Sequence, residues 1–184
     1  MKQINYILVT GAARSGKSTL RKKVLQKYGL NGFCTDSLVS MLMHAHPELG
    51  ISFEMEKLEV KEKYVTGLLQ YLNDSPVLLE GIGISAKNWP EYKNYEDIAM
   101  IGIGNCGISA AEKMQNIRKF PSYNEWAANL EDEKLYKLCE RLIDHSIQTK
   151  IECEKFGIRF FDTSNNFDKV IEAAADYVYT LTRS

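Results

Sequence analysis

The sequence predicts an α/β fold, in which helices cover both faces of a parallel sheet. Five short apolar runs alternate with longer segments of helical pattern along the chain. Uninterrupted apolar runs are typical of strands that are buried on both faces, and parallel strands require crossover connections, which are usually helices. The chain has 184 residues, which is the size of one domain, so residues 1–184 are interpreted as a single unit.

The first half of the chain contains three of the predicted strands. The run Tyr6–Thr10 reads YILVT and ends at a glycine, and Leu20, Val24 and Tyr28 then recur every four residues, as on one face of a helix. Gly29 stands where a helix C-cap is expected. The elements predicted here are a strand over 6–10, a helix over 18–28, a strand over 32–35, a helix that starts at residue 36, a long helix over 53–72 and a strand over 77–81.

The second half contains two more strands and the most regular helix of the chain. That last helix has apolar residues at positions 170, 173, 174, 177, 178 and 181, which is helical spacing. Pro121 follows a short basic helix and begins a polar, aromatic stretch without periodicity. The elements predicted here are a strand over 98–103, a helix over 109–119, a loop to residue 129, a helix over 133–156, a strand over 158–162 and the final helix.

The composition is that of a globular domain without a membrane-spanning segment. Apolar residues make up 45% and charged residues 26% of the chain, and no apolar run approaches the roughly 18 residues of a membrane span. We therefore expect a soluble, cytoplasmic protein with no membrane partner. The four cysteines lie far apart, without metal-ligand or CxxC spacing, and are interpreted as reduced packing residues.

Charge is distributed unevenly along the chain. The net charge is −1, but the first 35 residues contain seven basic and no acidic residues, which leaves −8 for the remainder. The start of the chain should therefore attract anions. Most of these cations are explained as the solvated face of one helix, and no recognised nucleic-acid-binding module is present, so a nucleic acid partner is not favoured. The sequence does not indicate an oligomeric state.

A phosphate-binding motif, GxxxxGK[ST], lies between the first strand and the first helix. Its glycines let the backbone curl so that N–H groups point at a phosphate, and the positive end of the helix faces the same point. Lys17 adds a charge for the β- and γ-phosphates, and the Ser18 hydroxyl is placed to bind Mg²⁺. The motif therefore predicts a nucleoside triphosphate and Mg²⁺ as cofactors, held by Gly11, Ala12, Ala13, Arg14, Ser15, Gly16, Lys17, Ser18 and Thr19.

With this motif, the chain resembles the small P-loop kinases, a group that includes shikimate, gluconate, nucleoside and nucleotide kinases and 2-phosphoglycerate kinase-like proteins. The resemblance extends over almost the whole architecture and is most specific in residues 11–18. It implies a three-layer α/β/α P-loop fold, a five-stranded parallel sheet in the order 2-3-1-4-5 and a lid after the fourth strand. The implied activity is transfer of the γ-phosphoryl group of ATP to the hydroxyl or phosphate of a small molecule, which the sequence does not identify.

Two carboxylates follow the predicted second and third strands. In this group of kinases, an acidic residue after the second strand commonly handles the acceptor hydroxyl or the metal, and Asp36 in CTDSL matches it. An acidic residue after the third strand commonly supports Mg²⁺, and Glu80 in VLLEG matches that one. The resemblance thus implies that Lys17 and Asp36 are catalytic and that Ser18 and Glu80 serve the metal. Two alternatives stay open, because the two carboxylates can exchange roles and Asp36 can be a helix N-cap.

The resemblance also implies a lid and a base-binding stretch. The lid is expected over residues 109–129, with Arg118 as the cation that closes on the phosphates, because a guanidinium stabilises spread charge better than the ammonium of Lys113 or Lys119 does. An ordinary solvated helix cation is the alternative for Arg118. Thr163 and Ser164, in FDTSNNF after the fifth strand, match the stretch that packs the nucleotide base, or else they cap the last helix.

The alternative function is an ATPase or nucleotide-gated switch that phosphorylates no small molecule. The sequence has no NKxD segment of the kind that many GTPases use for guanine, and it is short for a full AAA+ module. A third reading is a binding module that keeps the phosphate cradle without turnover. Whether an acceptor accelerates the release of ADP separates the three.

Overall fold

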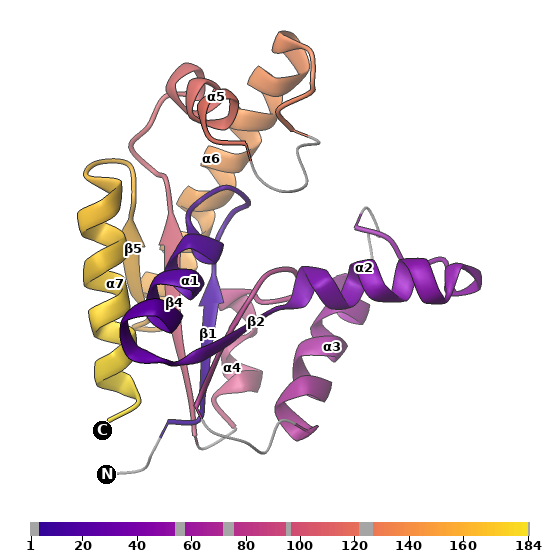
Figure 1. Cartoon of the computed structure of the whole chain (residues 1–184), viewed down its shortest axis with the longest axis vertical. Helices are drawn as coiled ribbons and strands as arrows, with labels where there is room; N and C mark the ends of the chain where they lie inside the picture. Colours follow the sequence, from indigo (N-terminus) through magenta and orange to yellow (C-terminus); the bar gives the residue numbers. More distant parts are fainter. Residues whose placement is uncertain (1–3, 54–57, 72–75, 95–96, 122–126, 184) are drawn as a thin grey trace.

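The computed structural model describes all residues except 1–3, 54–57, 72–75, 95–96, 122–126 and 184, and it has three layers, with helices on both faces of a central sheet (Figure 1). The strands are β1 (Tyr6–Thr10), β2 (Asn31–Cys34), β3 (Val77–Glu80), β4 (Ile98–Gly104) and β5 (Arg159–Asp162). The helices are α1 (Lys17–Tyr28), α2 (Thr35–Ala45), α3 (Leu58–Tyr71), α4 (Trp89–Tyr92), α5 (Ala110–Lys119), α6 (Asp132–Lys155) and α7 (Phe167–Leu181), with short 3₁₀ turns η1 (Pro47–Leu49) and η2 (Ala86–Asn88).

The five strands form one parallel sheet in the order β2-β3-β1-β4-β5, which confirms the predicted fold class and strand order. β1 lies at the centre, where Leu8 faces Leu79 of β3 on one side and Met100 of β4 on the other. Because the strands are parallel, their carboxyl ends meet at one edge of the sheet. The residues that end the strands at this edge are Thr10, Cys34, Glu80, Gly104 and Asp162.

Two apolar cores hold the layers together. On one face, Leu8 and Leu79 pack against residues of α3, α4 and α6, and on the other face Ile7 and Leu78 pack against α1 and α7. All four side chains have an exposed fraction of 0%, so each stabilises the fold by roughly 1.5–3 kcal/mol. The central strand is therefore fixed from both sides, and so is the loop that follows it.

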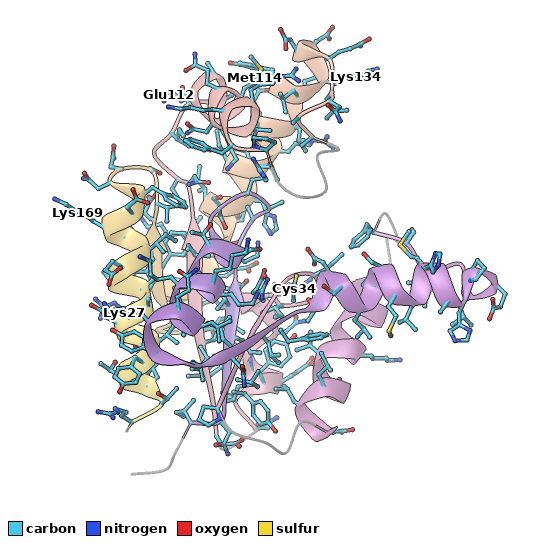
Figure 2. The ribbon with its side chains drawn as sticks, in the orientation of Figure 1. Lys27, Cys34, Glu112, Met114, Lys134 and Lys169 are labelled. Atoms are coloured by element: carbon cyan, nitrogen blue, oxygen red, sulfur yellow. The ribbon has the colours of Figure 1, made fainter. Side chains whose placement is uncertain are left out.

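A third, smaller core lies above the carboxyl edge of the sheet (Figure 1). It joins α5 to the first half of α6 through Ile117, Leu135, Leu138, Cys139 and other apolar residues. Figure 2 shows Met114 and Glu112 on α5 in this upper part of the molecule. We call α5, residues 127–130 and the first half of α6 the α5–α6 unit.

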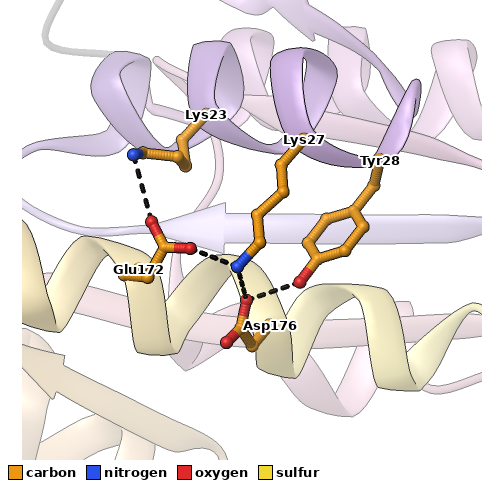
Figure 3. A network of polar contacts seen from close by, with 5 residues as sticks. All are labelled: Lys23, Lys27, Tyr28, Glu172 and Asp176. Atoms are coloured by element: carbon orange, nitrogen blue, oxygen red, sulfur yellow. Dashed lines mark hydrogen bonds and ion pairs between the residues drawn. The ribbon is translucent and has the colours of Figure 1, made fainter.

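A network of ion pairs joins α1 to α7 on the surface (Figure 3). Lys27 contacts both Glu172 and Asp176, Lys23 contacts Glu172 at 3.0 Å, and the Tyr28 hydroxyl donates to Asp176 at 2.5 Å. These contacts lower the pKa of both carboxyl groups below the usual range for carboxylates, and they raise the pKa of Lys27 above the usual range for lysine. The exposed cations of α1 are thus partly explained by pairing with α7.

Most element boundaries lie within one residue of the predicted ones, and the clearest differences concern β2, α2 and α3. β2 starts at Asn31 and ends at Cys34, one residue earlier than predicted, so α2 starts at Thr35. The described part of the predicted helix over 53–72 is helical only from residue 58 to 71, and residues 54–57 and 72 lie outside the described residues.

No helix in the described ranges is long and apolar enough to cross a membrane.

Candidate active site

The phosphate-binding motif forms the turn between β1 and α1, as predicted. Gly11 has a φ of +151° and Gly16 a φ of +110°, both in the region that favours glycine. A Cβ on Gly11 would lie 2.0 Å from the carbonyl oxygen of Ile103 in β4, so the loop passes against the neighbouring strand. Ala12 and Ser15 are buried within this loop, whereas Ala13, Ser18 and Thr19 are exposed. We call residues 11–18 the P-loop.

Lys17 reaches back over the P-loop. Its Nζ donates to the carbonyl oxygens of Gly11 at 2.8 Å and Ala12 at 2.7 Å. Burial lowers the pKa of Lys17, while the negative charges of Glu80 and Asp36 raise it. The ammonium group is therefore held over the loop by backbone carbonyls, and the charges of two carboxylates act on it.

Glu80 is an almost completely buried carboxylate at the end of β3, with an exposed fraction of 1%. Its Oε1 accepts from Nε of Arg21 in α1 at 3.1 Å. The stem of Arg21 lies against Gly32 of β2, where a Cβ would be 2.4 Å from its Cγ. A buried carboxylate requires such a partner, because its charge is costly to remove from water.

Asp36 does not cap α2, so that alternative is wrong. The helix starts at Thr35, Cys34 occupies the N-cap position, and Asp36 lies in the first turn. The Asp36 carboxylate instead accepts from the backbone N–H of Ile82 at 2.7 Å, in the loop after β3. Thr35 Oγ1 donates to the carbonyl of the same Ile82 at 2.7 Å. These two bonds fix the β3 loop to the start of α2 and bring Asp36 to the edge that carries Glu80.

Cys34 also belongs to this edge of the sheet (Figure 2). Burial raises the pKa of its thiol to about 11, and the charges of Glu80 and Asp36 act in the same direction. The thiol is therefore kept protonated at neutral pH beside the two carboxylates. All four cysteines are free, in agreement with the interpretation from sequence.

A buried polar network connects the P-loop to the ends of β4 and β5. Thr163 Oγ1 accepts from Nδ2 of Asn105 at 2.6 Å and lies 3.0 Å from the carbonyl oxygens of both Ser15 and Gly104, one of which receives its proton. On the other side, Asn105 Oδ1 accepts from Nζ of Lys113 at 2.6 Å. The network thus runs from the P-loop backbone to a lysine of α5.

Thr163 and Ser164 do not cap the last helix, so that alternative is also wrong. The N-cap of α7 is Asn166, in a left-handed conformation. Ser164 Oγ accepts from the N–H of Gly107 at 2.7 Å and donates to Asp162. Ser164 therefore joins the loop after β5 to the loop after β4.

Arg118 contacts the segment that precedes α6. Its guanidinium donates to the carbonyls of Ala128 and Leu130 and to the carboxylate of Asp132. In the described residues these contacts fix the segment before α6 to α5, and they do not include the P-loop. The role of Arg118 at the phosphates stays a prediction, as does the lid over 109–129, of which residues 122–126 lie outside the described residues.

The sequence reasoning missed several residues around the P-loop. Arg21 and Asn105 were not singled out, although Asn105 is a polar residue directly after an apolar strand, which is a usable signal. Arg118 was preferred to Lys113, but Lys113 is the cation of α5 that is buried beside the P-loop, with an exposed fraction of 2%. A capping box of Ser109 and Glu112 starts α5, and its spacing is visible in the sequence.

One buried side chain of the P-loop has a free hydrogen-bonding capacity. Ser15 has an exposed fraction of 1%, and its Oγ has no hydrogen-bond partner among the described residues. A buried hydroxyl without a partner is unusual in a folded protein. The loop can therefore offer an oxyanion both the N–H groups of its curled backbone and the unused hydroxyl of Ser15.

The oxygen donors at this edge suit Mg²⁺. In the ranges that the structure describes, no three His, Cys, Asp or Glu side chains form a metal-binding group. Mg²⁺ prefers oxygen ligands, and it is usually bound by one or two protein groups together with phosphates and water. The hydroxyl of Ser18 and the carboxylate of Glu80 are such groups, and they lie on elements that flank the P-loop.

Comparison with known proteins shows the fold. No protein-family model and no curated protein sequence matches the chain. Among solved structures, shikimate kinase from Bacteroides thetaiotaomicron is similar with a TM-score of 0.61 at 15% identity, covering 97% of this chain and 98% of that one. A gluconokinase from Sinorhizobium meliloti 1021 has a TM-score of 0.59 at 10% identity, with 100% and 96% covered. Shikimate kinase from Acinetobacter baumannii, solved in complex with shikimate, has a TM-score of 0.58 at 13% identity, with 97% and 92% covered.

These neighbours are P-loop small-molecule kinases, and each likeness extends over nearly the full length of both chains. They confirm the predicted fold class and the predicted resemblance. At such identities the likeness concerns the backbone arrangement, so activity has to be argued from the residues of this chain.

Proposed function

We propose that the protein is an ATP-dependent phosphotransferase, a kinase that transfers the γ-phosphoryl group to the hydroxyl or phosphate of a small molecule. The observation that carries this proposal is the meeting of three groups at one edge of the sheet. Lys17 lies over the P-loop, and its pKa responds to the charges of both Asp36 and Glu80. A phosphate cradle beside two carboxylates is the arrangement that phosphoryl transfer needs.

The triphosphate is bound by the P-loop in this proposal. The backbone of residues 11–18 and the Lys17 ammonium supply the positive field, and the Ser15 hydroxyl supplies a further donor. Thr163 and Ser164 lie beside the loop, where the base of the nucleotide would pack. The choice of ATP as the triphosphate follows the resemblance to the small P-loop kinases.

Mg²⁺ would be held by Ser18 and Glu80, and when bound it neutralises charge on the phosphates. The contact with Arg21 fixes the Glu80 carboxylate in position and supplies a positive partner inside a buried site. The protein groups thus act mainly by positioning and by neutralising charge, which is how most phosphoryl transfer is catalysed.

The transfer step forms one bond and breaks one. The acceptor oxygen attacks the γ-phosphorus, the bond from the γ-phosphorus to the bridging oxygen breaks, and that oxygen leaves on ADP. The acceptor hydroxyl loses its proton, and Asp36 accepts it or orients the hydroxyl. Asp36 is exposed at the start of α2 and fixed by the N–H of Ile82, so it can face an acceptor that enters beside α2.

The test is nucleotide binding followed by a phosphoryl-transfer screen. Lys17→Ala should weaken binding of a non-hydrolysable ATP analogue by at least about tenfold, because it removes the charge over the P-loop. Lys22→Ala removes an exposed lysine of the same helix and is the matched control. The screen offers nucleosides, nucleotides, sugars and small hydroxy acids with ATP and Mg²⁺.

Two outcomes would contradict the proposal. Unchanged analogue affinity in Lys17→Ala would show that the P-loop does not hold the triphosphate. Hydrolysis of ATP at one constant rate, with no acceptor in the screen becoming phosphorylated, would favour the ATPase or switch alternative.

A further inference from the structure

The side chain of Arg14, a residue of the P-loop, contacts the end of α5. Its guanidinium donates to the carbonyl oxygens of Phe120 and, at 3.5 Å, Ile117. Both carbonyls belong to the last turn and C-cap of α5. The last carbonyls of a helix have no partner within the helix and carry its partial negative charge, so a cation is favourable there. The P-loop therefore caps the end of α5.

A second contact runs in the opposite direction, from α5 to the P-loop. Nζ of Lys113 lies 3.4 Å from the carbonyl oxygen of Arg14 and 2.6 Å from Oδ1 of Asn105. Lys113 is almost fully buried, and burial together with the charges of Lys17 and Arg14 lowers its pKa to about 8. Arg14 thus holds α5 through its side chain and is held by α5 through its backbone. We call these contacts the Arg14 clasp.

The backbone of Arg14 supports a special role for this residue. Its φ is +59°, in the left-handed region, where a residue other than glycine costs roughly 1 kcal/mol. Such a conformation persists only where the surroundings fix it. The contacts with α5 hold both the side chain and the backbone carbonyl of this strained residue.

We propose that Arg14 is a positioning residue, which docks α5 on the P-loop before nucleotide binds and thereby presets the loop for the triphosphate. The proposal rests on the proposed function only in its second half, because the docking itself needs no nucleotide. A protein whose binding-competent state is populated only in part binds its ligand more weakly by that fraction. Loss of the clasp should therefore weaken nucleotide binding without removing any phosphate contact of the backbone.

The first experiment measures amide hydrogen exchange in the nucleotide-free protein. Arg14→Met keeps most of the side-chain length and removes the guanidinium, and we expect amides of α5 to exchange at least about tenfold faster, while α1 and α7 stay unchanged. Arg141→Met removes an exposed arginine of α6 and is the matched control. Unchanged exchange in α5 of Arg14→Met would overturn the proposal.

Arg14→Gly separates the contact from the backbone strain. Glycine adopts a positive φ freely but has no guanidinium, so it should loosen α5 as much as methionine does. Normal protection of α5 in Arg14→Gly would show that the guanidinium is dispensable and would overturn the proposal. Lys113→Met, introduced into the wild type and into Arg14→Met, completes a double-mutant cycle. The losses of α5 protection caused by the two substitutions should be less than additive, because the contacts form one clasp.

The second experiment measures the affinity of a non-hydrolysable ATP analogue. Arg14→Met should weaken it about five- to twentyfold, and Arg14→Lys, which keeps the charge, should restore part of the loss. Faster exchange in α5 with unchanged affinity would overturn the positioning role. Failure of the unaltered protein to bind the analogue would contradict the proposed function, and the exchange result would still decide the docking.

Discussion

Replacing Lys113 by methionine should change the pH dependence of stability in a defined direction. Lys113 is the buried ammonium between α5 and the P-loop, and its pKa is lowered from 10.5 to about 8, first by burial and then by the charges of Lys17 and Arg14. The Cys139 thiol is the other titratable group that faces it. Below pH 8 the folded protein keeps this charge buried, whereas methionine has no charge to bury.

The size of the effect follows from the pKa. One pKa unit corresponds to about 1.4 kcal/mol, so a drop from 10.5 to about 8 corresponds to about 3 kcal/mol. Between these values the folded protein has lost the proton that the unfolded chain still binds, so stability rises with pH. The free energy of unfolding of the wild type, relative to Lys113→Met, should therefore increase by about 2.5 kcal/mol from about pH 7 to about pH 10.

The assay is urea denaturation of both proteins at the two pH values. Both carry Cys139→Ala, which removes the neighbouring thiol from the titration. Lys137→Met, which removes an exposed lysine of α6 paired with Glu133, is the control and should show no such increase, because no charge is buried there. If the difference in the free energy of unfolding between wild type and Lys113→Met stays constant with pH, the assignment of Lys113 as a buried charge is refuted.

Two further predictions concern the P-loop and the acceptor side. Gly11→Ala should destabilise the protein by at least about 2 kcal/mol in urea denaturation. The added Cβ would lie 2.0 Å from the backbone oxygen of Ile103, and the φ of residue 11 is +151°. A loss below about 0.5 kcal/mol would show that the loop can move away from β4. Asp36→Asn should leave analogue binding within about twofold and slow transfer to an identified acceptor at least about a hundredfold, and full turnover would show that Asp36 has no part in the chemistry.

The sequence predicted the fold well because the fold depends on local patterns. Strands buried on both faces leave apolar runs, and β1 has the predicted bounds Tyr6–Thr10. The buried faces of the helices were predicted less exactly. In α7 the buried residues include Ile171 and Ala175, whereas Ala173, assigned to the buried face from its spacing, is exposed. The packing of α1 against α7 fixes this rotation, and that packing is not visible in the periodicity of one helix.

The position of the P-loop turn was predicted because its residues are close in sequence. The P-loop is one continuous motif, so its position and curled backbone follow from the order of its residues. Arg21 and Glu80 are 59 positions apart in the sequence, and Arg14 and Phe120 are 106 positions apart. Neither contact is therefore visible as a local pattern in the sequence. The choice of Arg118 over Lys113 came from side-chain chemistry alone. The structure adds that α5 turns Lys113, and not Arg118, toward the P-loop.

Apart from Arg21, which pairs with Glu80, the charges around the P-loop are separated by sign, and this separation limits what the acceptor can be. Arg14 and Lys113 lie on the side of α5, Asp36 and Glu80 lie on the side of β2 and β3, and Lys17 interacts with both groups. Phosphate oxygens are favoured on the cationic side and repelled on the other. We therefore expect the acceptor to present a neutral hydroxyl to Asp36. Any anionic group that the acceptor carries should bind away from these two carboxylates, since like charges close together in a partly buried site cost several kcal/mol.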